Sequence, residues 1–200
     1  SMFVMLAKCK LSDATGQVPL RGCWGNHDAS TWPAPGLVRD GLIGLTPLHG
    51  MARAIRTSVT PTAAETADDA AAWAWMEVES GVPQVVSGVV DAFVPQMVNL
   101  ELVGGVSFKK GCFPGQEVVA RSQYRGTLKR RMQMFTSGVP MAPGQEVFHA
   151  SDASQPAGTV VSAASLHGGH LALISLKSAV LDASGSTRLA LGQANGAELV

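Results

Sequence analysis

From Thr127 onward, short runs of alternating apolar and polar residues are separated by turn residues. The runs predict strands at Met132–Thr136, Gln145–His149, Gly158–Ala163, His170–Leu176 and Thr187–Leu191. Glycine, proline and serine clusters between the runs predict the turns. Evenly spaced strands with turn signals are typical of a small antiparallel barrel, so we assign 127–200 to a C-terminal β-barrel.

The first 126 residues predict a mixture of strands, loops and helices. Strands are expected at Phe3–Leu11 and Val18–Trp24, and the stretch from Gly25 to Pro61 predicts loops with one or two short strands. Val94–Val103 predicts a loop that enters a short helix, which Gly104 ends. The whole chain is therefore expected to be α+β, with a domain boundary near 127–131.

Two longer helices are predicted in this region. The first covers Thr62–Gly81, with Thr62 and Glu65 as a capping box and with Ala71, Trp75 and Val78 on one face. The second covers Pro114–Arg125, with proline in its favoured first position. Glu79 falls in the last turn of the first helix, where the helix dipole disfavours an anion. It is either a solvated carboxylate or an acceptor for a polar ligand.

Composition narrows the classes of protein. Charged residues make up 15% of the chain, with 15 basic and 15 acidic residues. No apolar run reaches the roughly 18 residues of a membrane span, so no membrane contact is expected. Three cysteines without CxxC spacing indicate neither a disulfide framework nor a zinc site, and they fit a reducing cytoplasm. No metal ligands are assigned.

Cys112 is the candidate reactive residue. It precedes the predicted start of the second helix, where backbone N–H groups favour an anion, and Lys109, Lys110, Arg121 and Arg125 add positive potential. Both effects favour thiolate over thiol. The alternative is a buried, inert thiol in a tight turn.

The residues around Cys112 suit a ligand as well. Gly111 and Gly115 would allow the backbone to approach a ligand closely, and Gln116 could cap the first helical turn. Seven of the fifteen basic residues lie between Lys109 and Arg131, with Glu117 as the only acid among them. Such a segment could bind RNA phosphates or a polycarboxylate, or be a solvated face.

Lys110–Glu117, KGCFPGQE, resembles the signature K-G-C-[FY]-x-G-Q-E of the YgfZ family of folate-binding proteins. The flanking stretches Phe93–Gln96, Asn99–Leu100, Ala120–Arg121 and Arg125–Gly126 agree with that family too. The resemblance implies a fold similar to the glycine-cleavage T-protein, with a folate pocket in 1–126 followed by the barrel. It also implies that Cys112 is the functional thiol and that Glu79 binds the pterin of tetrahydrofolate.

The resemblance further implies an accessory role in the maturation or repair of iron–sulfur enzymes, including some that modify tRNA. Lys110, Gly111, Gly115, Gln116, Arg121 and Arg125 would then contact folate, tRNA or another polyanion. The alternative is an aminomethyltransferase like the T-protein, which would form methylene-tetrahydrofolate from an aminomethyl-lipoyl carrier. A third possibility is an RNA-binding module.

The chain departs from that family at its beginning. Phe3–Leu11 resembles an interior strand of the first domain, so we expect that a preceding segment, which would complete the folate pocket, is missing here. An unpaired edge strand would also favour dimerisation.

Overall fold

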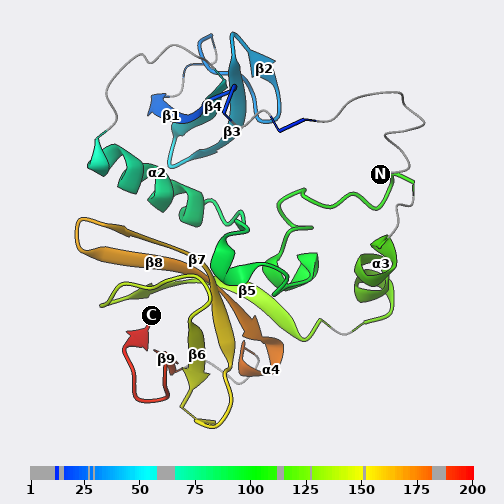
Figure 1. The fold of residues 1–200 in the computed structure, drawn as a ribbon, viewed down its shortest axis with the longest axis vertical. Helices are drawn as coiled ribbons and strands as arrows, with labels where there is room; N and C mark the ends of the chain where they lie inside the picture. Colours follow the sequence, from blue (N-terminus) through cyan, green and yellow to red (C-terminus); the bar gives the residue numbers. More distant parts are fainter. Residues whose placement is uncertain are drawn as a thin grey trace. The chain divides into compact units, whose positions relative to one another are not determined.

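The computed structural model describes residues 12–13, 16–26, 28, 30–57, 66–111, 115–126, 128–150, 152–181 and 188–200 (Figure 1). The chain is α+β and divides into two compact units, Ser1–Glu65 and Thr66–Val200. Phe3–Leu11, the Thr62–Glu65 pair and Cys112 lie outside the described residues. The expected boundary near 127–131, and a T-protein-like domain before it, stay predictions.

The first unit contains a four-stranded antiparallel sheet. Its strands are β1 (Leu20–Asn26), β2 (Val38–Arg39), β3 (Leu42–Leu48) and β4 (Met51–Thr57), in the order β1-β4-β3-β2. Three of these strands fall between Gly25 and Pro61, so the prediction of one or two short strands there was too low. The β3–β4 register shifts between Leu45 and Leu48, around Pro47, which has no N–H for the ladder.

The second unit contains a closed antiparallel barrel. Its strands are β5 (Arg130–Ser137), β6 (Glu146–His149), β7 (Gly158–Leu166), β8 (Gly169–Lys177), β9 (Leu189–Leu191) and β10 (Glu198–Leu199), in the order β10-β5-β8-β7-β6-β9. A short helix, α4 (Ser178–Leu181), follows β8. The predicted barrel is confirmed. The two-residue β10, too short to show alternation, was not predicted.

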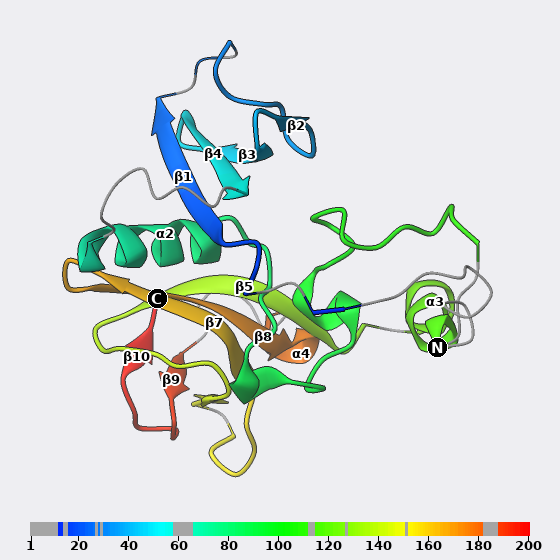
Figure 2. The same cartoon turned by 45° about the horizontal axis from the view of Figure 1, so that its top comes forward.

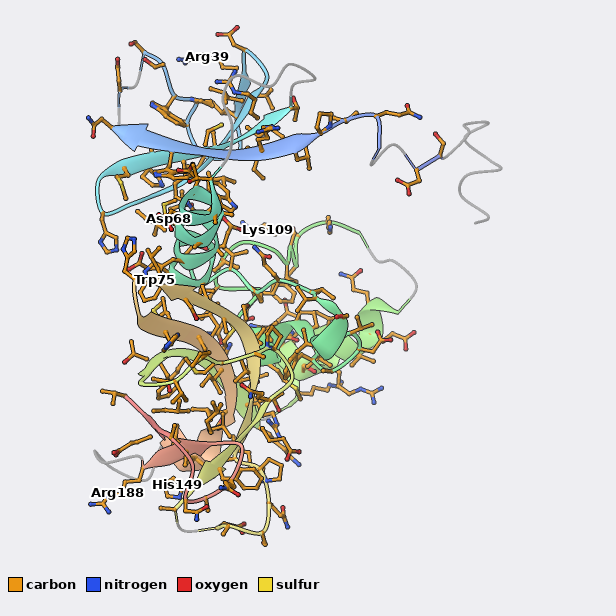
Figure 3. The ribbon with its side chains drawn as sticks, turned by 60° about the vertical axis from the view of Figure 1, so that its left-hand side comes forward. Arg39, Asp68, Trp75, Lys109, His149 and Arg188 are labelled. Atoms are coloured by element: carbon orange, nitrogen blue, oxygen red, sulfur yellow. The ribbon has the colours of Figure 1, made fainter. Side chains whose placement is uncertain are left out.

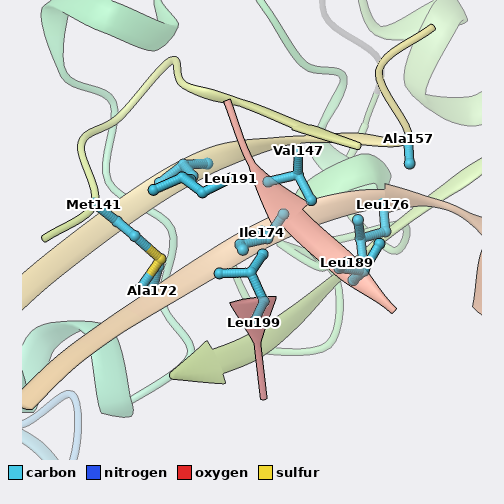
Figure 4. Close-up of a cluster of buried hydrophobic side chains, with 10 residues drawn as sticks. Met141, Val147, Ala157, Ala172, Ile174, Leu176, Leu189, Leu191 and Leu199 are labelled. Atoms are coloured by element: carbon cyan, nitrogen blue, oxygen red, sulfur yellow. The ribbon is translucent and has the colours of Figure 1, made fainter. Parts of the chain in front are cut away.

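Both faces of β8 are buried. Ala172, Ile174 and Leu176 point into the barrel, where they pack with side chains of the neighbouring strands (Figure 4). Leu171 and Leu173 belong to a second cluster on the outer face. Because the side chains of a strand alternate between faces, an almost continuous apolar run was needed to bury both sides of this strand.

Helix α2 (Ala67–Glu79) covers that outer cluster. Val78 and Trp75 pack against Val161 and Leu171, and Figures 1 and 2 show α2 lying across the β7–β8 hairpin. The ring of Trp75 also lies close to Gly169, where an added Cβ would come within 3.3 Å of it. The predicted helix and its apolar face are confirmed, apart from Ala71, which is half-buried and outside this cluster.

The start of α2 differs from the prediction. The helix begins at Ala67, five residues after Thr62, and Thr66 is its N-cap. The Thr66 hydroxyl accepts from the Asp69 N–H at 3.1 Å, and the Asp69 carboxylate accepts from the Thr66 N–H at 3.0 Å. This reciprocal capping box uses a Thr-x-x-Asp spacing four residues later than expected. At the other end, Gly81 adopts a φ of 72° after the last turn, as a helix stop requires.

Short helical segments connect α2 to the barrel. They are the 3₁₀ turns η1 (Ser87–Val89) and η2 (Pro95–Val98), followed by α3 (Gln116–Tyr124). Gly88 in η1 lies so close to the barrel turn that an added Cβ would meet the Pro143 carbonyl oxygen at 2.7 Å, and this contact fixes the segment after α2. Of the helices in the described residues, none has the length and apolar character to cross a membrane.

Candidate functional site

Helix α3 begins with the last two residues of the KGCFPGQE segment, Gln116 and Glu117, and it is held by few contacts. None of its nine described side chains is buried. Its attachment to the rest of the unit includes the fully buried side chain of Gln96, whose Nε2 donates to the Val119 carbonyl at 2.7 Å. The ring of Tyr124, at the end of α3, contacts the ring of Phe108 edge-on, with centroids 5.9 Å apart.

The Phe108–Tyr124 contact joins two residues that lie on either side of Cys112 in the sequence. It brings together the chain before the signature and the end of α3, and therefore also their neighbours Lys109 and Arg125. This contact was not predicted from the sequence. The sequence gives little indication of this contact, since two aromatic residues sixteen positions apart match no short-range pattern.

The basic residues of the segment fall into two groups. Arg131 forms an ion pair with Glu101 and also donates to the Gln96 carbonyl at 3.3 Å, while Arg130 donates to the Ser175 carbonyl at 3.5 Å. These two support the fold. Exposed side chains make up the other group, namely Lys109 (Figure 3), Lys110, Arg121, Arg125 and Lys129. The positive surface is thus smaller than the seven residues counted in the sequence.

The start of α3 lies too far from Cys112 in the sequence for the helix dipole to stabilise the thiolate strongly. The helix begins at Gln116, not Pro114, after Gly115 with a φ of 84°. Gln116 is the first helical residue rather than the third, so it cannot supply the N3 half of a capping box. Cys112 lies four positions before the helix, and the dipole effect falls off within one turn. The nearby cations remain as the support for an ionised Cys112.

A second feature of this unit is a cavity of about 200 Å³ between α2 and the barrel. We call it the α2–β7 cavity, and Trp73, Ala74, Glu77, Val78, Val82, Gln84, Val86, Pro143, Ser162 and Ala163 line it. Its walls are largely apolar. The lining residues with polar side-chain atoms are Trp73, Glu77, Gln84 and Ser162. Such a combination is common in small-molecule sites.

Glu77, and not Glu79, lines this cavity. The Gln84 Nε2 donates to Glu77 Oε2 at 2.6 Å. This hydrogen bond offsets the unfavourable interaction between the Glu77 carboxylate and the helix dipole in a last turn that has no basic residues. Glu79 is half-buried and has partners of its own. The sequence analysis named Glu79 as the residue for ligand contact. The structure gives the cavity-lining position to Glu77.

Ser162 reaches the cavity because of a β-bulge. Val160 pairs with Ile174 and Ser162 pairs with Leu173, so β7 contains one residue more than β8 at this point. A bulge turns neighbouring side chains to the same face. The Ser162 Oγ is buried and has no hydrogen-bond partner among the described residues. No sequence signal marked this residue, because the bulge depends on how β7 and β8 pair.

Comparison with known proteins gives sequence relatives. No family model matches the chain. It is 36% identical to the tRNA-modifying protein YgfZ of Edwardsiella ictaluri over 124 residues, 60% of this chain and 38% of that protein. It is 40% identical over 99 residues to the protein of the same name from Photorhabdus laumondii, and 35% identical over 102 residues to that of Escherichia coli. The matches support membership of the YgfZ family.

The similarity to YgfZ proteins confirms the resemblance stated from KGCFPGQE. This chain spans about a third of the length of the YgfZ relatives it matches, from 30% to 38%. Their printed name describes them as tRNA-modifying. The roles of Cys112, Glu79 and the other predicted site residues in this chain stay predictions. Of these, Gly115, Gln116, Arg121 and Arg125 lie together at α3, with Lys110 and Gly111 just before the signature cysteine.

Proposed function

We propose that this chain belongs to a folate-dependent accessory protein that assists the maturation or repair of iron–sulfur enzymes, including enzymes that modify tRNA. The observation that carries the proposal is the KGCFPGQE segment in a chain similar to proteins named tRNA-modifying protein YgfZ. The Phe108–Tyr124 contact supports it, because it brings together two stretches of chain in which the next residues, Lys109 and Arg125, are exposed cations. The protein would act in the cytoplasm, where its thiols stay reduced.

Cys112 is the proposed functional thiol. Lys109, Lys110, Arg121 and Arg125 raise the local positive potential, which favours the thiolate, the reactive form of cysteine. Gly111 and Gly115 leave room for a ligand beside the thiol, since nothing described lies within 4 Å of a Cβ added at either. A thiolate in such a setting can attack a disulfide or persulfide sulfur or bind a cluster in transit.

A complementation experiment tests the thiol. The full-length gene, wild type or with Cys112→Ala, is expressed in cells that lack their own copy, and the activity of an iron–sulfur enzyme that modifies tRNA is measured. We expect Cys112→Ala to lose most of the rescue. Cys23→Ala is the matched control, because Cys23 is half-buried in the other unit and its Sγ lies 3.9 Å from the Arg21 carbonyl. Full rescue by Cys112→Ala would remove the thiol from the mechanism.

Folate binding rests on the resemblance. The α2–β7 cavity, about 200 Å³, is smaller than the roughly 300–1,000 Å³ of typical ligand sites, and it is lined by Glu77. A complete tetrahydrofolate does not fit it, so a folate contact of Glu79 requires protein surface beyond this cavity. Calorimetric titration of the full-length protein with tetrahydrofolate tests the role. Glu79→Gln should weaken binding about tenfold or more if the carboxylate pairs with the pterin N–H edge.

The exposed cations support contact with tRNA or another polyanion. Each neutralised phosphate contributes about 0.9 to the slope of log affinity against log salt concentration in duplex DNA and about 0.7 in single strands. The double variant Arg121→Ala/Arg125→Ala should therefore bind tRNA more weakly and lower the slope by about 1.5. Arg188→Ala, an exposed arginine of the barrel, is the control. Equal slopes for the wild type and the double variant would exclude α3 from the contact.

A further inference from the structure

Among the described residues, Tyr124 is the one aromatic side chain that is largely exposed, at 72%. The Phe108 ring contacts it edge-on, with the two ring planes at 71°. A neighbour in this geometry covers at most one face of the tyrosine ring, so a flat aromatic face stays open to solvent. Because the ring is already held by Phe108 and by α3, a group that stacks on it meets a preformed surface, which reduces the entropy cost of binding.

Unpaired cations lie beside this ring. Arg121 is three residues before Tyr124 on α3, so the two side chains are neighbours on the helix surface. Arg125 follows Tyr124 directly, and Lys109 follows Phe108 directly. The side chains of these three cations are exposed, and none of them forms an ion pair or hydrogen bond with another described residue. Their charges are therefore available to an anionic ligand.

An open aromatic face with cations at its edge matches the chemistry of a nucleotide. A base stacks on such a ring, and the phosphates on either side of the base pair with guanidinium and ammonium groups. The base has to be unpaired, since the bases of a duplex are stacked on one another and do not expose their faces. An acidic protein segment would pair with the cations but has no need of the tyrosine ring.

We propose that Tyr124 forms a stacking site for one unpaired base of an RNA loop or single strand, with Arg121 and Arg125 at the phosphates beside that base. This inference rests on the tRNA contact proposed above and specifies which part of the RNA is bound. Phe108 is a positioning residue, because its edge-on contact fixes the plane of the tyrosine ring.

The probe is a short single-stranded oligoribonucleotide with one central 2-aminopurine between uridines, because the fluorescence of 2-aminopurine falls when this base stacks. It is titrated with the full chain, and a duplex of the same sequence is titrated separately. We expect saturable quenching with the single strand only. Tyr124→Leu should abolish the quenching and weaken the affinity about fivefold to a hundredfold, as expected for the loss of one stacked base. Tyr124→Phe keeps the aromatic face and should retain both.

The salt dependence separates stacking from charge. Tyr124→Leu removes no charge, so the slope of log affinity against log salt concentration should stay unchanged, whereas Arg121→Ala/Arg125→Ala lowers it. If Tyr124→Leu disordered α3 instead, the cations would be displaced and the slope would fall as well. Val118→Ala is the matched control, because it removes an exposed apolar side chain from the same helix, and it should leave the affinity unchanged.

Polyglutamate tests the other class of partner, an acidic protein segment. It carries negative charge without bases, so Tyr124→Leu should not change its affinity. The proposal is overturned if Tyr124→Leu binds the single strand as tightly as the wild type does, if the duplex gives the same quenching, or if polyglutamate and the single strand lose affinity equally.

Failure of the stacking site is distinguishable from failure of the proposed function. A lower salt slope in Arg121→Ala/Arg125→Ala without any effect of Tyr124→Leu would remove the stacking site and leave the tRNA contact standing. No saturable binding of the wild type to the single strand would overturn the stacking site, and the rescue experiment with Cys112→Ala would still test the thiol independently.

Discussion

Two serines with buried hydroxyl oxygens, on adjacent strands of the barrel, should respond to the same substitution with opposite changes in stability. On β7, the Ser162 Oγ has no partner among the described residues. On β8, Ser175 is fully buried, and its Oγ donates to the Met97 carbonyl of η2 at 2.9 Å. Both changes to alanine remove one oxygen from a buried position. The difference between them is whether that oxygen makes a hydrogen bond.

The expected magnitudes follow from this difference. An unsatisfied buried hydroxyl costs about 1–3 kcal/mol of desolvation, so Ser162→Ala should raise the free energy of unfolding by about 1 kcal/mol after some loss of packing. Ser175→Ala loses a hydrogen bond worth about 1 kcal/mol and leaves the Met97 carbonyl unpaired, so stability should fall by about 1–2 kcal/mol. The two variants should therefore differ by about 2–3 kcal/mol.

Urea unfolding followed by fluorescence measures both values. A real change in stability shifts the midpoint without changing the slope m. Thermal unfolding should give midpoints on either side of the wild type, by about 3 °C for each kcal/mol. If Ser162→Ala destabilises the protein as much as Ser175→Ala does, the Ser162 hydroxyl is already paired.

Two further predictions concern the helices. Gln96→Leu removes the hydrogen bond to the Val119 carbonyl, so amide hydrogen exchange should accelerate in α3 and stay slow in β8. Equal acceleration in both elements would contradict a local role for this hydrogen bond. The pKa of Asp69 is lowered from its usual 3.8, first by the Thr66 side chain and then by the Thr66 N–H. The stabilisation of α2 by the Asp69 carboxylate is therefore present above pH 3.8 and is lost as the pH falls through the lowered pKa. Thr66→Ala should reduce the protection of α2 amides from hydrogen exchange at about pH 7, and it should make that protection depend less on pH.

The barrel could be predicted from the sequence, and the sheet of the first unit could be predicted only in part. Turn residues separate the runs that form five of the six barrel strands, and one of these, β8, is a long apolar run. In the first unit, β4 reads Met-Ala-Arg-Ala-Ile-Arg-Thr, with a buried arginine, Arg53, between two buried alanines. Small and charged residues inside a strand obscure the alternation of apolar and polar positions from which a strand is predicted. Pro47 similarly argues against the strand that β3 forms.

The candidate sites differ in how far the sequence could reveal them. The KGCFPGQE segment is contiguous, so its likeness to YgfZ proteins could be read directly from the sequence, and the role of Cys112 stays a prediction. The α2–β7 cavity combines a helix, a loop and a bulged strand, and the bulge that directs Ser162 exists only once β7 and β8 are paired. The pairing of β7 with β8 at the bulge cannot be predicted from residue type and spacing.

The geometry of α2 separates Glu79 from the α2–β7 cavity. Successive residues of a helix are about 100° apart, so Glu79 lies about 160° around the axis from Glu77. Val78 and Trp75, which pack on the barrel, lie between these two directions. A ligand at Glu79 and a ligand in the α2–β7 cavity would therefore approach opposite flanks of α2. It follows that Glu77→Gln should change tetrahydrofolate binding to the full-length protein much less than Glu79→Gln does, and an equal loss of affinity in the two variants would contradict this separation.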